Sequence, residues 1–247
     1  MPDPREAKRV IRQPFDEAIF GVPYFRIPNP DAEGLTSAFE TALAPHSTAK
    51  ADARPAVEAR ATLSRLEGLG FHRVCTQVTF HAAAAMTPPD PAIVEADRWT
   101  LSPDDLDARA LGFVFSRFAQ DVKTAPQLAQ RWIRTWLANS VSGRRRVLAL
   151  GPDVVTWAPP DKQGVLTIDL VSVLRAGQGH GSRLILHLRG LAGRLGASRV
   201  QVTTEAENVA AQRLYTRCGF ELDHARACLH YTHKRAHHPT SPSSTTD

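Results

Sequence analysis

The sequence predicts a mixed α/β fold, because strand-like and helix-like segments alternate along its second half. Residues 165–173 (VLTIDLVSV) are mostly apolar and rich in β-branched side chains, which is typical of a strand. A glycine-rich loop follows, and residues 184–195 then repeat leucine at helical spacing. A second strand is predicted over 197–204 and a second helix from Asn208. This order favours a sheet flanked by helices.

A glycine-rich loop separates the first of these strands from its helix. Gly177, Gly179 and Gly181 stand at alternate positions before the helical leucines. Glycine lets backbone N–H groups approach an anionic oxygen, and the dipole at a helix N-terminus favours negative charge. The loop therefore favours phosphate binding; the alternative is a tight turn without a ligand.

The second helix presents a polar and aromatic face. Asn208 opens it, and Ala211 and Tyr215 follow three and seven residues later, which places them on one face. Gly219 is typical of a C-terminal cap, and Phe220 follows it. The chain therefore holds two motifs, a glycine loop and a tyrosine helix, in a fixed order.

These two motifs resemble those of a known superfamily. Residues 177–185 (GQGHGSRLI) resemble the pyrophosphate loop of the GCN5-related N-acetyltransferase (GNAT) superfamily. Residues 207–220 (ENVAAQRLYTRCGF) resemble its Asn-x-x-Ala-x-x-Leu-Tyr-x-x-x-Gly-Phe helix. The resemblance implies the GNAT fold, an α/β architecture whose mixed central sheet is flanked by helices and splays apart between the two strands that flank the glycine loop. It also implies acetyl-CoA as co-substrate, with its pantetheine arm between those strands.

The resemblance further implies which residues bind the cofactor, through the loop, the main chain of the preceding strand and the first residue of the tyrosine helix. They are Val171, Val173, Gln178, Gly179, His180, Gly181, Ser182, Arg183 and Asn208. Arg183 is equally consistent with a solvated helix residue, and His180 with a neutral loop residue. The chain departs from the family at Ala176, where Gln or Arg is usual, and its turn before Gly177 is shorter. Both departures predict that the backbone contributes more of the binding.

Tyr215 is the candidate catalytic residue. Acetyl transfer to an amine passes through a tetrahedral intermediate and expels a thiolate, and a phenol of pKa about 10 can protonate a thiolate of pKa about 8.5. In the GNAT superfamily this tyrosine acts as the general acid; the alternative is a core tyrosine. The base is open between Asp169, within the first strand, and Glu205, at the end of the next. Each can also be a solvated or arginine-paired carboxylate.

Composition excludes several other functions. The 247 residues carry a formal net charge of +5 and are 43% hydrophobic, which suits a chain that folds around a core and handles anionic ligands. No basic block with interleaved aromatic residues argues for nucleic acid. No segment approaches the roughly 20 apolar residues that span a bilayer, and the N-terminus lacks the apolar run of a signal peptide. No membrane association is expected, and the cytoplasm is the predicted compartment.

Cysteine and histidine usage predicts no metal site. Cys75, Cys218 and Cys228 are an odd number without metal-ligand spacing, which indicates reduced thiols. The histidines near the C-terminus lack the close pairing and carboxylate partners of a metal centre.

The chain is predicted to divide into five regions. They are a flexible N-terminus (1–13), a smaller N-terminal α/β domain (14–82), a linker (83–91), a GNAT domain (92–234) and a disordered tail (235–247).

In the N-terminal domain we expect a turn leading into a strand over 14–27, a helix within 32–43, a polar connection over 45–54, a helix from Pro55 to Leu69 and a strand over 71–80. In the GNAT domain, before the glycine loop, we expect a strand over 93–99, a helix capped by Ser102, an amphipathic helix over 127–139 and strands over 147–150 and 154–158. A last strand is expected over 227–233.

Four segments resemble the dTDP-fucosamine (dTDP-4-amino-4,6-dideoxygalactose) acetyltransferase group of bacteria. They are residues 14–27 (PFDEAIFGVPYFRI), 66–80 (LEGLGFHRVCTQVTF), 115–121 (FSRFAQD) and 132–143 (WIRTWLANSVSG). The implied acceptor is a nucleotide-linked 4-amino-4,6-dideoxyhexose. Ser116, Arg117 and Phe118 would then lie near the sugar, with Arg117 as a substrate-binding residue; a surface ion pair is the alternative.

Other functions remain open at this point. The acceptor could be another small amine or a protein N-terminus, and a homodimer is possible. A non-catalytic module that binds CoA thioesters is an alternative of another class. A dinucleotide-binding fold is disfavoured, because Ser182 stands where that fingerprint has its third glycine.

Overall fold

A mixed sheet of ten strands runs through the part of the protein that the structure describes. The computed structural model describes residues 9–174 and 177–234. The strand order is β1-β2-β3-β10-β4-β9-β8-β7-β6-β5, and the pairs β2–β3 and β8–β9 are parallel. The strands are β1 (Ile11–Arg12), β2 (Tyr24–Ile27), β3 (Thr48–Ala53), β4 (His72–Ala83), β5 (Val94–Ala96), β6 (Arg146–Leu150), β7 (Asp153–Ala158), β8 (Val165–Ser172), β9 (Arg199–Glu205) and β10 (Glu221–Lys234).

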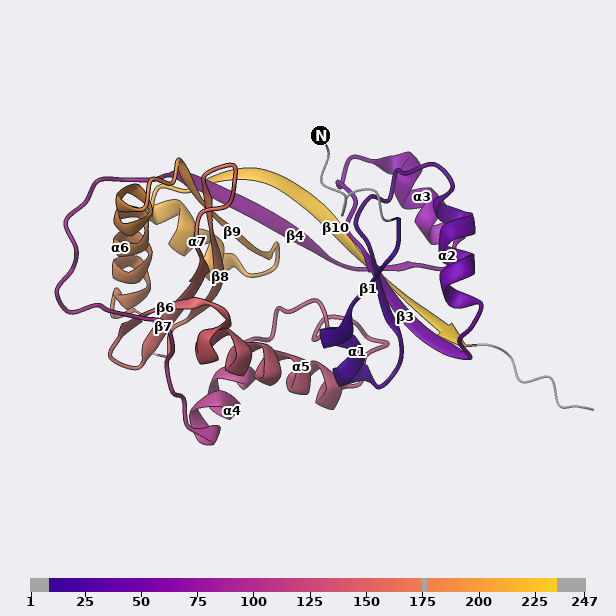
Figure 1. Ribbon diagram of the computed structural model, residues 1–247, viewed down its shortest axis with the longest axis horizontal. Coiled ribbons are helices and arrows are strands. Elements are labelled where there is room, and N and C mark those ends of the chain that lie inside the picture. Colours follow the sequence, from indigo (N-terminus) through magenta and orange to yellow (C-terminus); the bar gives the residue numbers. More distant parts are fainter. Residues whose placement is uncertain (1–8, 175–176, 235–247) are drawn as a thin grey trace, which may run out of the picture.

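Seven α-helices of the described residues flank this sheet. They are α1 (Pro14–Phe20), α2 (Leu35–Leu43), α3 (Arg60–Gly68), α4 (Pro103–Gly112), α5 (Pro126–Asn139), α6 (His180–Arg194) and α7 (Val209–Arg217), and α5 continues into a π-helical turn, η1 (Ser140–Arg144). Figure 1 shows α6 and α7 near one end of the molecule, α2 and α3 at the other, and α1, α4 and α5 between them. None of the described helices is long and apolar enough to cross a membrane.

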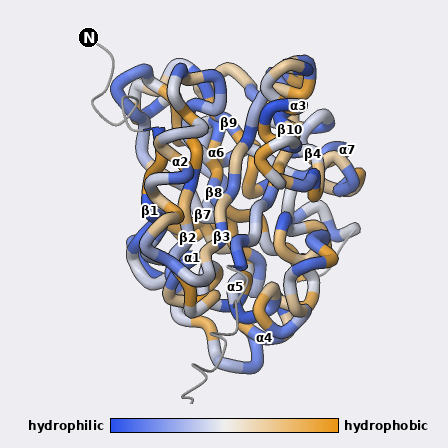
Figure 2. Tube along the Cα trace, turned by 90° about the vertical axis from the view of Figure 1, so that its right-hand side faces the viewer, coloured by the Kyte–Doolittle hydropathy of each residue, from blue (hydrophilic) through white to orange (hydrophobic). Residues whose placement is uncertain are grey.

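Each face of the sheet is covered by its own helices. We call the face under α2, α3, α6 and α7 the α6 face; its hydrophobic clusters contain leucines of α2, α3 and α6. The opposite, α5 face packs Ile133 and Leu137 of α5 against Val154 and Leu170. Because side chains alternate along a strand, neighbouring residues of one strand serve opposite faces. Figure 2 shows hydrophobic stretches along the strands and hydrophilic stretches mainly on the outer segments.

Two long strands join the ends of the molecule. β4 has 12 residues and β10 has 14, and they pair with each other along most of their length. β10 also pairs with β3, and β4 with β9, so one ladder connects the two ends (Figure 1). The predicted domain boundaries around residues 82 and 92 stay predictions, although the sheet runs through residues from both sides.

Most predicted elements of the second half are confirmed. The capping box of Ser102 and Asp105 starts α4, and the amphipathic helix, the glycine-loop strand and the tyrosine helix lie where the sequence placed them. The last strand begins at Glu221, earlier than predicted.

Two expectations for the first half were wrong. Residues 14–20 form α1, where no helix was predicted, because Pro14 is compatible with a first helical turn and Gly21, with φ of 69°, ends the helix. The strand predicted after the turn is present as β2. Residues 48–53 form β3 rather than a polar connection. Ala49, Ala51 and Ala53 of that strand are fully buried on the α6 face. Their small side chains belong to the core, although the segment as a whole has a polar composition.

The segment predicted as a linker packs closely on α6. The Ala85 N–H donates to the Arg189 carbonyl, and Arg194 donates to the Thr87 carbonyl. Gly190 and Gly193 of α6 leave the room for this segment, since a Cβ at either position would overlap Thr87 or Ala85. The predictions for residues 1–8, Ala176 and the tail 235–247 lie outside the described residues.

Candidate active site

The sheet opens between the two parallel strands that flank the glycine loop. β8 and β9 pair from Val165 with Arg199 to Ile168 with Val202, and the ladder ends there although β8 continues to Ser172 and β9 to Glu205. Asp169 is an extra residue in the pairing of β8 with β7, which makes it a β-bulge. Because a bulge bends its strand, it turns β8 away from β9 at the point where the pairing stops. The predicted splay is therefore confirmed.

The start of α6 lies beside this opening. The first N–H groups of a helix have no acceptor within it, and the N-terminal cap of α6, Gly179, provides no side chain for them. Gly177 and Gly179 have φ of 86° and 76°, a conformation that glycine adopts without strain. A Cβ at Gly181 would lie 3.2 Å from Leu214 Cδ2 and 3.4 Å from Val173 Cγ2. The glycines thus bring free amides close to the end of β8.

A buried carboxylate holds this loop in place. Asp153, which is fully buried at the start of β7, accepts a hydrogen bond of 2.7 Å from the Leu174 N–H. Its second oxygen lies 2.7 Å from His180 Nδ1. Asp153 therefore fixes both ends of the loop, and His180 has a positioning contact in addition to its predicted place near a phosphate.

Two other predicted cofactor residues make contacts within the protein. Arg183 donates to Asp90 through Nε at 2.9 Å, with Nη2 at 2.7 Å from the same oxygen, and so links α6 to the segment before β5. The Asn208 side chain accepts from the Ala211 N–H and donates to Thr204 Oγ1, each at 3.2 Å, which caps α7. Gln178 and Gly179 are exposed, and Ser182 and the strand residues Val171 and Val173 are half-buried beside the opening.

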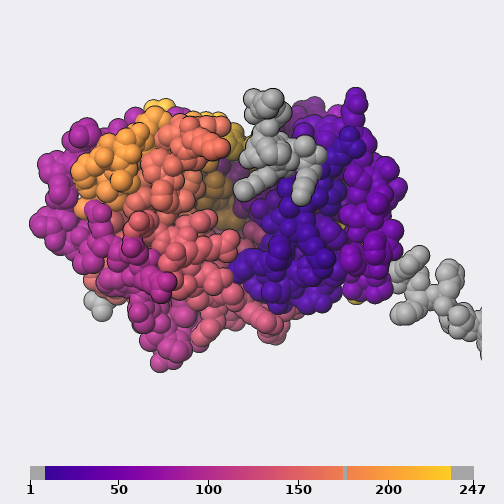
Figure 3. Space-filling model, viewed as in Figure 1, coloured from indigo at the N-terminus to yellow at the C-terminus, as the bar shows by residue number. Residues whose placement is uncertain are grey.

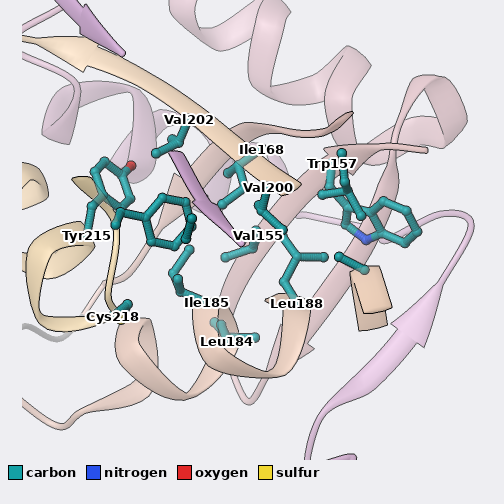
Figure 4. Close-up of a cluster of buried hydrophobic side chains, with 14 of the residues drawn as sticks. Val155, Trp157, Ile168, Leu184, Ile185, Leu188, Val200, Val202, Tyr215 and Cys218 are labelled. Atoms are coloured by element: carbon teal, nitrogen blue, oxygen red, sulfur yellow. The ribbon is translucent and has the colours of Figure 1, made fainter. Parts of the chain in front are cut away.

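Tyr215 belongs to the hydrophobic cluster under α6 and α7. It is 4% exposed and packs against Phe80 and Phe220, with ring centroids 6.0 and 5.9 Å away. Burial raises the pKa of its phenol, and the nearby Glu205 carboxylate raises this pKa further. Figure 4 shows Tyr215 at one end of the cluster, with the hydroxyl on the side of the ring away from Cys218. Among the described residues, no hydrogen-bond partner takes this hydroxyl.

The two candidate bases differ in their surroundings. Asp169 accepts a 2.7 Å hydrogen bond from Ser140 Oγ and pairs with Arg145 at 3.4 Å, so it is the arginine-paired carboxylate that the sequence left as an alternative. Glu205 lies at the end of β9, and burial raises its pKa even though a 3.4 Å hydrogen bond from Gln77 acts to lower it. Glu205 is therefore better suited to accept a proton near neutral pH.

Arg117 lies in a buried contact between α1, α5 and its own segment. It is 8% exposed, its Nη2 is 3.3 Å from Asp16 Oδ1, and Trp132 Nε1 donates to the same oxygen at 2.6 Å. Its guanidinium lies over the rings of Phe118 and Trp132, at 4.2 and 4.9 Å from their centroids. The arginine is thus part of a packed ion pair, and its predicted contact with substrate stays a prediction.

A polar groove of about 360 Å³ lies on the α5 face of the sheet, which α5 leaves uncovered there. We call it the arginine groove. Its lining comes from β2, β3, β4, β9 and β10 and their ends: Arg26, Ile27, Pro28, Arg54, Gln77, Thr79, Gln201, Thr203, His224 and Arg226. Figure 3 shows one face of the molecule, with a hollow in the surface between the indigo N-terminal residues and the salmon-coloured middle of the chain.

The arginine groove was not predicted from the sequence. Its charged residues are scattered along the sequence from Arg26 to Arg226. Arg54 directly follows β3, where the sequence predicted a polar connection. Alanine alternates with Lys50 and Asp52 in β3, and this pattern could have predicted the strand, because a period of two favours a strand with two different faces.

The groups of histidine, cysteine and carboxylate residues within 9–174 and 177–234 do not form a metal site.

Comparison with known families matches residues 154–220 to the model of the acetyltransferase (GNAT) family. The match begins in β7 and ends after α7, so it covers the splay, the glycine loop and Tyr215. None of the curated proteins matches the chain.

Solved structures of GNAT proteins resemble the whole fold. The GCN5-related N-acetyltransferase from Sphaerobacter thermophilus is 14% identical with a TM-score of 0.52, over 90% of this chain and 75% of that one. A GNAT-family acetyltransferase from Novosphingobium aromaticivorans is 16% identical with a TM-score of 0.52, over 93% and 90%. A tandem GNAT protein of clavulanic acid biosynthesis is 14% identical with a TM-score of 0.50, over 86% and 76%. The chain has the GNAT fold, and the family match supports its place in that superfamily.

Proposed function

We propose that this chain, which has the GNAT fold, transfers an acetyl group from acetyl-CoA to a primary amine. The observation that carries the proposal is the opening beyond Ile168 and Val202, because it lies beside the free amides at the start of α6. A pyrophosphate on those amides would direct the pantetheine arm along the main chain of Val171 and Val173. The thioester would then reach the sheet near Glu205 and Tyr215.

The proposed chemistry uses these two side chains. The amine nitrogen attacks the thioester carbonyl carbon, and its proton passes to the Glu205 carboxylate, directly or through water. The tetrahedral intermediate collapses as the carbon–sulfur bond breaks, and the sulfur receives a proton from the Tyr215 phenol. The raised pKa of Tyr215 keeps the phenol protonated, so it can donate a hydrogen bond to the departing sulfur, but it also makes the phenol a weaker acid. After the transfer, water carries the proton held by Glu205 back to the Tyr215 phenolate, and the products are the amide and free CoA.

For the acceptor we propose the amino group of a nucleotide-linked 4-amino-4,6-dideoxyhexose. The support is the resemblance of four segments to the dTDP-fucosamine acetyltransferase group. One of those segments contains Arg117, and in the structure the side chain of Arg117 forms an ion pair with Asp16. We therefore propose that Arg117 shapes the wall of the acceptor site by holding α1 against α5.

The test is release of thiol from acetyl-CoA in the presence of a panel of amines. The panel contains dTDP-linked 4-amino-4,6-dideoxyhexoses, free amino sugars, small diamines and peptides with a free N-terminus. We expect amine-dependent release, with the highest kcat/KM for the dTDP-linked sugars. A preference for peptides or diamines would retain the acetyltransferase and replace the acceptor. Binding of acetyl-CoA without release by any amine would favour the non-catalytic module.

A further inference from the structure

The arginine groove has a strongly one-sided charge. Its ten lining residues include the cations Arg26, Arg54 and Arg226 and the imidazole of His224, which lies 2.9 Å from Asp223 Oδ2, and none of the ten is a carboxylate. The remaining polar residues are uncharged hydroxyl and amide side chains that can donate hydrogen bonds. A concave surface lined by guanidinium groups and such donors attracts anions.

A buried carboxylate below the groove orients two of its arginines. Asp52 is fully buried, and its Oδ2 accepts from Arg26 Nε and from Arg54 Nε, each at 3.2 Å. The two arginine side chains are 33% and 28% exposed. Each guanidinium uses Nε for this contact, so its terminal nitrogens remain for a ligand. Two guanidinium groups on one carboxylate also leave a net positive charge at the groove.

The third arginine lies beside these two. The Arg226 Nη1 donates to the backbone carbonyl of Arg54 at 3.2 Å, which brings the side chain of β10 over the end of β3. Arg226 is exposed, so its remaining N–H groups face solvent. Three guanidinium groups therefore converge from β2, β3 and β10.

Strand register connects the arginines to the proposed reaction site. Glu205 pairs with Gln77, and Gln77 pairs with Arg226, so the three form one row across β9, β4 and β10. Gln77 also donates to the Glu205 carboxylate. Two strand spacings separate the ends of this row, which is roughly 10 Å. An acceptor of sugar size can span this distance.

We propose that the arginine groove binds an anionic group, a phosphate or a carboxylate, of the acceptor whose amine lies at Glu205. This inference deepens the proposed function and rests on it for the identity of the amine. Arg26, Arg54 and Arg226 are specificity-determining residues in this assignment. The acceptor class is thus an amine whose anionic group lies roughly 10 Å or less from its nitrogen.

The first experiment compares acceptors and arginine variants in the thiol-release assay. The acceptors are a dTDP-linked amino sugar, the same amino sugar as its 1-phosphate, an amino sugar acid and the uncharged amino sugar. In Arg226→Gln we expect the KM for the preferred anionic acceptor to rise roughly 10- to 100-fold, as the loss of one charge-assisted hydrogen bond implies. The kcat and the KM for the uncharged sugar should change less than about twofold.

Arg131 provides the matched control, because it is an exposed arginine of α5 outside the groove. Arg131→Gln should leave every KM unchanged. A lower KM for the 1-phosphate than for the amino sugar acid would identify a phosphate as the bound group, and the reverse order would identify a carboxylate. An uncharged acceptor that is turned over as well as the anionic ones, or an Arg226→Gln effect equal on both, overturns the assignment.

The second experiment does not depend on turnover. Binding of inorganic pyrophosphate to the whole chain is measured by calorimetry with CoA present in excess, so that the glycine loop is not the site observed. We expect binding that is lost in Arg54→Gln and Arg226→Gln and kept in Arg131→Gln. Equal binding in all variants overturns the groove assignment. If no amine is acetylated but the groove still binds pyrophosphate, the proposed function fails while the anion site stands.

Discussion

At the scale of single residues, burial sets the chemistry of the site. Tyr215 lies in a hydrophobic cluster and Glu205 at the edge of the opening, and burial raises the pKa of both. A raised pKa keeps the phenol neutral. It also brings the pKa of the carboxylate closer to neutral pH, where a general base must accept a proton. A tyrosine on an exposed helix and a glutamate at an exposed strand end would have neither property.

Replacing Tyr215 by phenylalanine tests the proposed acid. The ring contacts with Phe80 and Phe220 are preserved, so folding should be little affected. We expect kcat to fall by roughly 100-fold while binding of acetyl-CoA is unchanged, because only the transition state loses its proton donor. Tyr231→Phe, on the other half of the sheet, is the control. An unchanged kcat in Tyr215→Phe would remove this residue from the mechanism.

The buried carboxylate below the arginine groove predicts a pH dependence of stability. Burial alone would raise the pKa of Asp52, but Arg54 and Arg26 outweigh it and hold this pKa well below its usual range. A lowered pKa in the folded state contributes stability that is present above the unfolded pKa of about 3.9 and is lost as the pH falls below it.

Asp52→Asn should therefore lower the free energy of unfolding at pH 7 by roughly 2–3 kcal/mol. It should also flatten the loss of stability between about pH 5 and pH 2, as measured by urea unfolding. Asp107→Asn, in an exposed ion pair with Arg134, is the control and should cost less than about 1 kcal/mol. Parallel pH profiles for the protein and for Asp52→Asn would contradict the assignment.

At the scale of elements, α6 does two things at once. Its N-terminus presents free amides beside the opening of the sheet, and its outer side packs against the segment from Ala85 to Thr87. Glycine costs helix stability relative to alanine, so the two glycines at the contact indicate that close packing of this segment outweighs helix propensity. The contact also positions Asp90, which holds Arg183 in the first turn of the helix.

Gly190→Ala tests this packing. The new Cβ would overlap Thr87 Oγ1 and lie 2.9 Å from the Thr87 carbonyl oxygen, so we expect a loss of about 1–3 kcal/mol in thermal or urea unfolding. Gly68→Ala in α3 is the matched control, since nothing lies within 4 Å of its Cβ. There alanine should be neutral or stabilising by up to about 1 kcal/mol. Equal effects at both positions would contradict the packing argument.

At the scale of the whole molecule, β4 and β10 make the two ends depend on each other. The hydrophobic cluster under α2 and α3 contains Ala227 and Leu229 of β10, while β4 supplies Val78 and Phe80 to the cluster under α6. A ladder shared in this way favours a single cooperative transition.

Urea unfolding followed by tryptophan fluorescence and by far-UV circular dichroism checks this expectation. The tryptophans, at positions 99, 132, 136 and 157, all lie in the predicted GNAT domain (92–234), whereas circular dichroism reports on both predicted domains. We expect coincident curves. A dichroism change that continues after the fluorescence change is complete would instead support separate folding of the two predicted domains.

The sequence by itself determined the part of the protein that holds the glycine loop and Tyr215. Local patterns suffice there, since the strand, the glycine loop, α6 and α7 follow one another along the chain, and Tyr215 and the loop lie within 40 residues. The splay could be predicted for the same reason, because the glycine loop directly connects the end of β8 to α6.

Only the tertiary structure decided the first half and the arginine groove. β3 carries alanine on one face and charge on the other, so its composition suggested a connection. Its alanines are core residues because they share a hydrophobic cluster with Leu35 of α2, Leu66 of α3 and Leu229 of β10. Arg26, Arg54 and Arg226 meet because β2, β3 and β10 are neighbours in the sheet. Their meeting depends on pairing between residues that lie about 170 positions apart, and no local pattern encodes such a pairing.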